Sequence, residues 1–252
     1  MAYFRLICCL LFLLLPGLSH GQLTVGFLVP VSGLGDQSFN DITYAGLIRA
    51  RNDFGLSLFI GQCDADPLSH KVEMEGLLEE GVDIVVANGW EFLDTVKEYA
   101  TKNPDKIFIL NDQAVSGYDN VVSTVFSQHE GAFLAGALAA MVSKEHQLGF
   151  VGGMDIPVIR SFLVGFQEGV RFIHKETSIS ISYLDRGENI GTGFDNPALG
   201  YKVAHELYDK NVDVIFSVAG LSGNGVIRAA AERKLYVIGV DADQDHMAKG
   251  YV

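Results

Sequence analysis

The sequence is poor in cysteine and has no long apolar run outside its N-terminal segment. Of its three cysteines, Cys8 and Cys9 lie in the first 21 residues, so Cys63 is the only one beyond them. A single thiol excludes a disulfide framework and a cysteine-based metal site from that part of the chain. The early apolar run, Leu6–Leu15, is shorter than the ~20 residues that span a bilayer, and no later stretch is a transmembrane candidate.

Basic residues are also scarce. The chain has 18 Lys and Arg against 31 Asp and Glu, which gives a formal net charge of −13. This balance argues against nucleic acid and anionic membrane surfaces as partners. The histidines show no ligand spacing and the carboxylates lack the D-x-D-x-D-G pattern, so we expect neither a metal nor a cofactor.

The first 21 residues have the pattern of a secretory signal peptide. Arg5 precedes the apolar run, and small residues, Ser19 and Gly21, stand at −3 and −1 of a cleavage point before Gln22. An uncleaved anchor is the alternative. Cys8 and Cys9 precede most of the apolar run, where a lipid-attachment cysteine would follow it. We therefore expect a secreted protein of the periplasm or cell surface.

From residue 22 onward, apolar runs alternate with helical patterns. The runs that indicate strands are Leu23–Val31, Leu56–Ile60, Val82–Ala87, Lys106–Leu110, Val121–Val125, Leu148–Val151, Ile179–Tyr183, Val212–Val218 and Leu235–Val240. The helical patterns are Phe39–Asp53, Pro67–Glu80, Glu91–Lys102, His129–Ser143, Val158–Phe172, Pro197–Lys210 and Asn224–Lys234. Such alternation with nearly continuous apolar strands is typical of α/β folds with parallel sheets covered on both faces.

A similarity between two stretches of the chain indicates two lobes. The stretch Glu80–Val86 resembles Lys210–Phe216, and each follows an amphipathic helix. We therefore predict one α/β lobe over residues 22–126 and another over 127–252, with a single larger sheet as the alternative. In such sheets ligands bind beyond the carboxyl ends of the strands. Facing loops from two lobes predict a cleft that closes by hinge motion.

Two stretches resemble motifs of enzymes. The run from Gly33 to Ser38 imitates a dinucleotide fingerprint, but Ser38 stands where the third glycine belongs. Ser38 and Asp41 instead have capping-box spacing, which predicts a helix start. Residues 219–223 lack the spacing of a nucleophile elbow, and Ser222 is better interpreted as a helix N-cap. Neither motif therefore supports a dehydrogenase or a hydrolase, although both remain open as alternatives at this point.

Carboxylates and aromatics recur where the predicted strands end. The acids are Asp36, Asp41, Asp112, Asp155, Asp241 and Asp243, and the aromatics are Phe39, Trp90 and Phe194. Taken singly, each acid is explained as a helix cap and each aromatic as part of a core. Taken together, acceptors and planar side chains around one cleft suit a planar ligand with hydroxyl or N–H donors.

Several stretches resemble one known family. They are Gly35–Asp41, Glu130–Gly136, Gly149–Ile159, Asp213–Gly220 and Ile238–Gln244. Together they are similar to signatures of the basic membrane protein family of solute-binding proteins, whose best-known members are purine nucleoside receptors of ABC importers. The resemblance covers residues 23–252. It implies a two-lobed, type I periplasmic binding protein-like fold that acts without catalysis, as a monomer, and hands a small solute to an ABC permease.

The resemblance also assigns ligand-binding residues by position. They are Asn40, Asp41 and Asp112 in the first lobe and Phe194, Gly220 and Asp241 in the second, with Leu34, Phe39 and Trp90 as further candidates. Phe194 would stack on a base and Asp241 would bind ribose hydroxyls.

Three departures from the family pattern stand out. Leu34 occupies the position of an opposing stacking aromatic, and the loop 186–192 looks longer than usual. Family members continue past the position of Val252 with a strand that returns to the first lobe, a helix and a cleft lysine, so the resemblance implies C-terminal truncation. A ligand-sensing ectodomain of a signalling receptor with the same fold is the alternative function.

Overall fold

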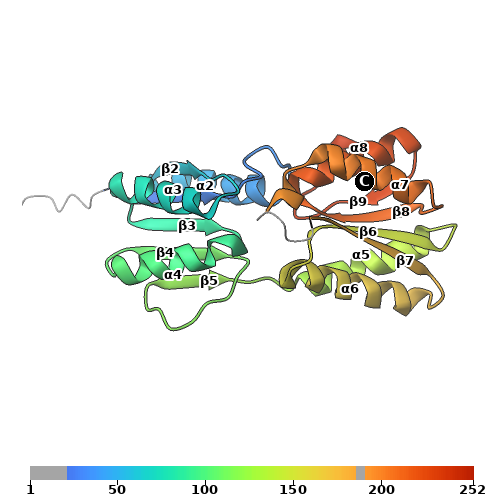
Figure 1. Ribbon diagram of the computed structural model, residues 1–252, viewed down its shortest axis with the longest axis horizontal. Helices are drawn as coiled ribbons and strands as arrows, with labels where there is room; N and C mark the ends of the chain where they lie inside the picture. Colours follow the sequence, from blue (N-terminus) through green and yellow to red (C-terminus); the bar gives the residue numbers. More distant parts are fainter. Residues whose placement is uncertain (1–21, 186–190) are drawn as a thin grey trace, which may run out of the picture.

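Two α/β lobes lie side by side along the long axis of the molecule (Figure 1). The computed structural model describes residues 22–185 and 191–252. Within them the strands form two separate, entirely parallel sheets. The predicted two-lobe arrangement is confirmed, and the alternative of a single larger sheet is wrong. The predicted signal peptide, residues 1–21, lies outside the described residues.

The first lobe holds a five-stranded sheet in the order β2-β1-β3-β4-β5. Its strands are β1 (Thr24–Val29), β2 (Ser57–Gln62), β3 (Ile84–Asn88), β4 (Ile107–Asn111) and β5 (Val121–Thr124). Its helices are α2 (Phe39–Phe54), α3 (Pro67–Glu79) and α4 (Leu93–Lys102), with a 3₁₀ turn, η2, at Trp90–Phe92. Helix α2 covers one face through Tyr44 and Leu47, and α3 and α4 cover the other through Met74 and Val96.

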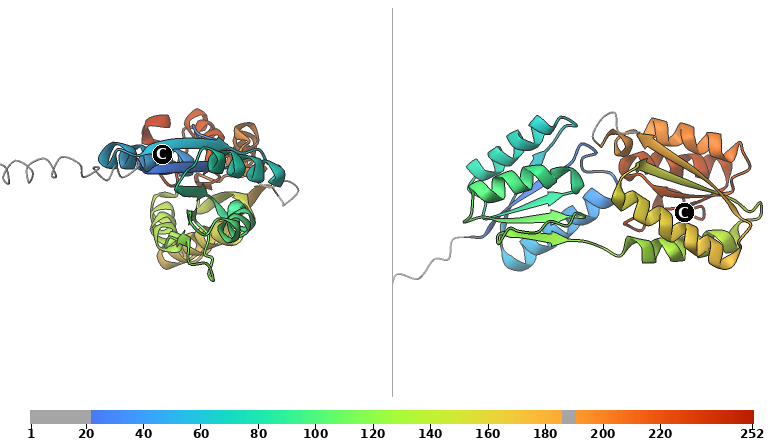
Figure 2. Two further views of the ribbon diagram at one scale, coloured as in Figure 1. Left: turned by 90° about the vertical axis from the view of Figure 1, so that its left-hand side faces the viewer. Right: turned by 60° about the horizontal axis from the view of Figure 1, so that its bottom comes forward.

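The second lobe holds a four-stranded sheet in the order β7-β6-β8-β9. Its strands are β6 (Gln147–Met154), β7 (Ser178–Asp185), β8 (Val214–Val218) and β9 (Tyr236–Ile238). Its helices are α5 (Gln128–Val142), α6 (Pro157–Ile173), α7 (Pro197–Tyr208) and α8 (Gly220–Arg233), with 3₁₀ turns η3 (Thr192–Phe194) and η4 (Asp245–Met247). Helices α5 and α6 pack on one face and α7 and α8 on the other, as both views in Figure 2 illustrate.

The elements form where the sequence patterns place them. Every residue of β8 is buried, as its unbroken apolar run requires. Asn196 accepts a hydrogen bond from the Leu199 N–H, and Pro197 occupies the first turn, so the predicted start of α7 is confirmed. None of the helices in the described part of the chain combines the length and apolarity of a membrane-spanning segment.

The predicted capping roles of two serines are wrong. Helix α2 does begin at Phe39, but the Ser38 hydroxyl makes no capping bond. The buried carboxylate of Asp36 accepts N–H bonds from Ser38, Asn40 and Asp41 instead, because the loop folds back to bring it under the free amides of the first turn. Ser222 lies inside α8, and its hydroxyl accepts a bond from the Asn196 N–H.

The chain passes from the first lobe to the second through residues 125–127, between β5 and α5. The predicted boundary at 126/127 falls in this segment. In Figure 1 it is the green connecting segment between the two lobes. The carboxyl ends of both sheets face the gap between the lobes, which places their loops opposite one another.

Candidate functional site

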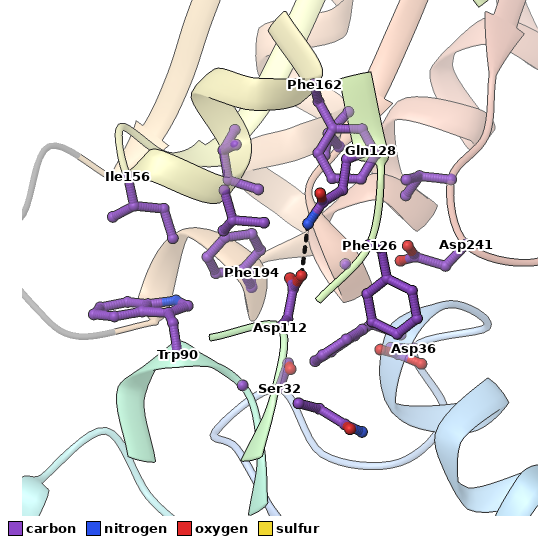
Figure 3. A pocket seen from close by; sticks show the side chains of 18 of the residues that line it. Ser32, Asp36, Trp90, Asp112, Phe126, Gln128, Ile156, Phe162, Phe194 and Asp241 are labelled. Carbon is purple, nitrogen blue, oxygen red and sulfur yellow. Dashed lines mark hydrogen bonds between the residues drawn. The ribbon is translucent and has the colours of Figure 1, made fainter. Parts of the chain in front are cut away.

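A cavity of about 620 Å³ lies between the two lobes (Figure 3). From the first lobe it is lined by residues that follow β1, β3 and β4, and from the second by residues that follow β6, β8 and β9. The convergence follows from the topology, because parallel strands all end at the same edge of their sheet. Its walls are mostly apolar, with a few polar side chains, as is usual for small-molecule sites.

Six of the residues predicted from the sequence line this cavity. They are Asp112, Phe194, Gly220, Asp241, Phe39 and Trp90. Figure 3 shows Trp90 reaching in from the first lobe and Phe194 from the second. The Phe194 ring lies directly on Gly153, where a Cβ would overlap it. The cavity therefore has an aromatic side chain on each side of the cleft.

Asp112 stands at the end of β4 and faces the second lobe. Its Oδ1 accepts a hydrogen bond from Gln128 Nε2 at 2.6 Å, which joins the first lobe to the start of α5. Burial and the nearby Asp241 carboxylate raise the pKa of Asp112 to about 7, although the bond from Gln128 opposes the shift. The charge on Asp112 is therefore sensitive to pH near neutrality.

Asp241 follows β9 in the left-handed backbone region, with φ of 66°. Its Oδ2 accepts a bond from Ser38 Oγ of the first lobe at 2.6 Å. The residue is open to solvent in the cleft, but protein on both sides limits the hydration of its carboxylate. This desolvation raises the pKa of Asp241 to about 6, with a smaller contribution from Asp36.

Two further acids line the cavity: Asp36, which the sequence places among the acids around the cleft, and Glu91, which it does not single out. Asp36 is 1% exposed, and burial raises its pKa. Burial also raises the pKa of Glu91 to about 7, with Asp112 contributing. With Asp112 and Asp241 they make four acids, and the lining residues that the structure describes include no Lys or Arg. The cavity therefore favours neutral or cationic ligands that carry hydrogen-bond donors.

Comparison with known proteins places this geometry in a family. The profile of the Bmp family, described as "ABC transporter substrate-binding protein PnrA-like", matches residues 23–252. The chain belongs to this family. Bmp proteins bind solutes for ABC transporters and are not an enzyme family, and they act outside the cytoplasm. The family predicted from the sequence motifs is thereby confirmed.

Individual Bmp relatives agree with the profile. Basic membrane protein A of Borreliella burgdorferi is 34% identical over 218 residues, which cover 84% of this chain and 62% of that protein. A CD4+ T-cell-stimulating antigen of Listeria monocytogenes is 30% identical over 240 residues, covering 90% and 64%. The chain thus spans somewhat less than two thirds of the length of these curated relatives.

Solved structures confirm the predicted periplasmic binding protein-like fold. A solute-binding protein of an ABC transporter system from Aeropyrum pernix superimposes with a TM-score of 0.80 at 29% identity, covering 88% of this chain and 63% of that one. A carbohydrate transporter solute-binding protein from Agrobacterium radiobacter, solved with D-arabinose, gives 0.65 at 16% identity, covering 90% and 78%, and shows the fold alone.

Three residues that the Bmp resemblance assigned to the ligand do not line the cavity. Asn40 is fully buried, and its amide bonds to Ser32, Gly33 and Asn88. Asp41 accepts N–H bonds from the loop residues Gly35 and Gln37, so its carboxylate is used in holding the loop. Leu34 is 38% exposed, at the surface of the same loop. Asn40 and Asp41 therefore hold the loop in place, whereas Asp36 lines the cavity.

Proposed function

We propose that this Bmp protein captures a purine nucleoside between its lobes and delivers it to an ABC permease. The observation that carries the proposal is the pairing of aromatics from both lobes with carboxylates at one cavity. Trp90 and Phe194 offer planar surfaces for a base. Asp112 and Asp241 offer charged acceptors for N–H and hydroxyl donors, and charged acceptors make the stronger hydrogen bonds.

Binding would couple to closure of the cleft. The groups come from both lobes, so a ligand that bridges Trp90 and Asp112 with Phe194 and Asp241 stabilises the closed arrangement. The lobes are joined covalently through residues 125–127 in the described chain, which allows one to rotate against the other. A permease that recognises the closed form would then distinguish loaded from empty protein.

Isothermal titration with inosine, adenosine and guanosine tests the proposed function. Trp90 is the only tryptophan of the chain and lines the cavity, so its fluorescence gives a second readout from inside the site. We expect heat release and a change in emission with at least one nucleoside. If none of the three nucleosides produced either heat or a change in emission, nucleoside binding would be contradicted. The sensing alternative uses the same cavity and differs only in the partner.

Nucleoside affinity is expected to fall as the pH is lowered from about 8 to about 5. Asp112 and Asp241, with pKa values of about 7 and about 6, accept bonds best when ionised. A ligand that bonds to the ionised form lowers these pKa values, so binding is strongest above the free-state values and weakens as pH falls through them. Titrations across this range, with thermal unfolding recorded at each pH, separate weaker binding from loss of fold.

A nucleoside 5′-monophosphate is expected to bind about tenfold more weakly than its nucleoside, because its phosphate would enter an acidic cleft. The four acids Asp36, Glu91, Asp112 and Asp241 line the cavity. Paired titrations of inosine and its monophosphate at low and high salt measure the difference. High salt should reduce the difference in affinity between inosine and its monophosphate, because it screens the repulsion. Equal affinities at low salt would show that the phosphate lies away from these acids.

A further inference from the structure

In addition to the covalent connection, hydrogen bonds join the lobes at the edge of the cavity. Ser38 Oγ donates to Asp241 Oδ2 at 2.6 Å, and Gln244 Nε2 donates to the backbone oxygen of Gln37 at 3.1 Å. The loop after β1 is thereby bonded to the segment after β9. Together with residues 125–127, this gives the two lobes a second, noncovalent connection.

Gln244 uses both ends of its amide, although it is only 3% exposed. Its Oε1 accepts a bond from the Val240 N–H at 3.0 Å, within its own lobe. Its Nε2 donates to Gln37 in the other lobe. These partners fix the orientation of the Gln244 amide. The Val240 N–H can bond only to the amide oxygen, and the Gln37 carbonyl only to the amide nitrogen.

The bond to Val240 holds the backbone that carries Asp241 into the cavity. The Gln244 amide lies against Gly239, where a Cβ would overlap its oxygen. Val240 and Asp241 follow directly in a tight turn, in which the Ala242 N–H donates to the Val240 oxygen. Asp241 has a positive φ, a conformation that a non-glycine residue keeps only where its surroundings enforce it.

We propose that Gln244 is a positioning residue that couples the placement of the Asp241 carboxylate to the separation of the two lobes. Its acceptor end sets the turn that aims Asp241, and its donor end holds that turn to the first lobe. The inference rests on the proposed function only in that Asp241 contacts the ligand. The coupling itself is a property of the empty protein.

The two ends can be separated by substitution. In Gln244→Glu at about pH 8 the side chain keeps an acceptor for Val240 but loses the donor to Gln37. In Gln244→Leu it loses both. The nearby pair His246 Nε2 and Gln37 Oε1, 3.1 Å apart, is exposed and competes with water, so it replaces little of the lost bond.

Hydrogen–deuterium exchange of the whole chain, followed by mass spectrometry, tests the bond that Gln244 accepts from the Val240 N–H. In Gln244→Leu the Val240 amide is expected to exchange about tenfold faster, because a partly buried hydrogen bond is lost. In Gln244→Glu it should stay protected. Equal protection in both variants would overturn the proposed role of the acceptor end.

Small-angle X-ray scattering tests the bond that Gln244 donates to Gln37, through the separation of the two lobes. Both variants are expected to have a larger radius of gyration than the unchanged chain, because neither can donate to Gln37. Gln167→Glu is the matched control, since it makes the same change on α6 of the same lobe at a residue that does not line the cavity. Scattering by Gln244→Glu that matches this control would overturn the coupling. If Gln244→Leu does not fold, the isosteric Gln244→Glu still decides it.

Ligand titration keeps the two proposals apart. If nucleosides bind, both Gln244 variants should bind them about tenfold more weakly while Gln167→Glu does not, because a displaced Asp241 makes poorer bonds. If the unchanged chain binds none of the three nucleosides, the proposed function fails. The exchange and scattering results then still decide the role of Gln244.

Discussion

Replacing Asp241 by asparagine is expected to weaken nucleoside binding by about 100-fold, because hydrogen bonds to a charged acceptor are worth about 1.5–3 kcal/mol each, more than neutral ones. In the proposed complex one carboxylate serves two vicinal hydroxyls, so both bonds lose their charge at once. The bond from Ser38 shows that the carboxylate already accepts from a hydroxyl at 2.6 Å. Isothermal titration with the tightest-binding nucleoside measures the loss.

The control for this substitution lies two residues away. Asp243→Asn removes the same charge from the same segment, but Asp243 does not line the cavity and its Oδ1 accepts from the Asp245 N–H, a bond that asparagine can keep. The affinity of this variant should equal that of the unchanged chain. Equal losses in Asp241→Asn and Asp243→Asn would mean that overall charge, and not a contact with Asp241, determines binding.

The sequence predicts most of the fold because its signals are local. Nearly continuous apolar runs such as Val214–Val218 belong to strands buried on both faces, and they are found as such. Asn196 and Pro197 fix a helix start within two residues. The rule that parallel strands present their carboxyl ends to ligands then brings Asp112, Phe194 and Asp241 to one place before any contact is known.

What the sequence could not predict depends on the path of the backbone or on distant partners. Asp36 and Asp41 lie in one loop, and the positive φ of Gly35 and Gln37 decides which carboxylate reaches the helix amides. Spacing favoured Asp41 because it follows Ser38 by three residues, whereas Asp36 precedes the helix. The bond from Gln244 to Gln37 joins residues 207 apart, a separation at which no local pattern exists.

Substituting Gly136 by alanine is expected to lower the free energy of unfolding by about 2 kcal/mol, as overpacking of about 3 kcal/mol outweighs about 1 kcal/mol of gained helix propensity. A Cβ at Gly136 of α5 would overlap the backbone oxygen of Phe166 in α6. Backbone cannot rotate away as a side chain can, so the helices must separate. Denaturant unfolding of the ligand-free chain measures the change.

Gly131→Ala, in the same helix, is expected to raise the free energy of unfolding instead of lowering it. Outside its own helix, no heavy atom lies within 4 Å of a Cβ at Gly131, so only the gain in helix propensity of about 1 kcal/mol remains. Equal effects of the two substitutions would show that α5 and α6 can move apart at little cost. That outcome would also bear on the cleft, because Gln128 at the start of α5 bonds to Asp112. A rigidly packed α5 keeps this bond in place while the lobes move.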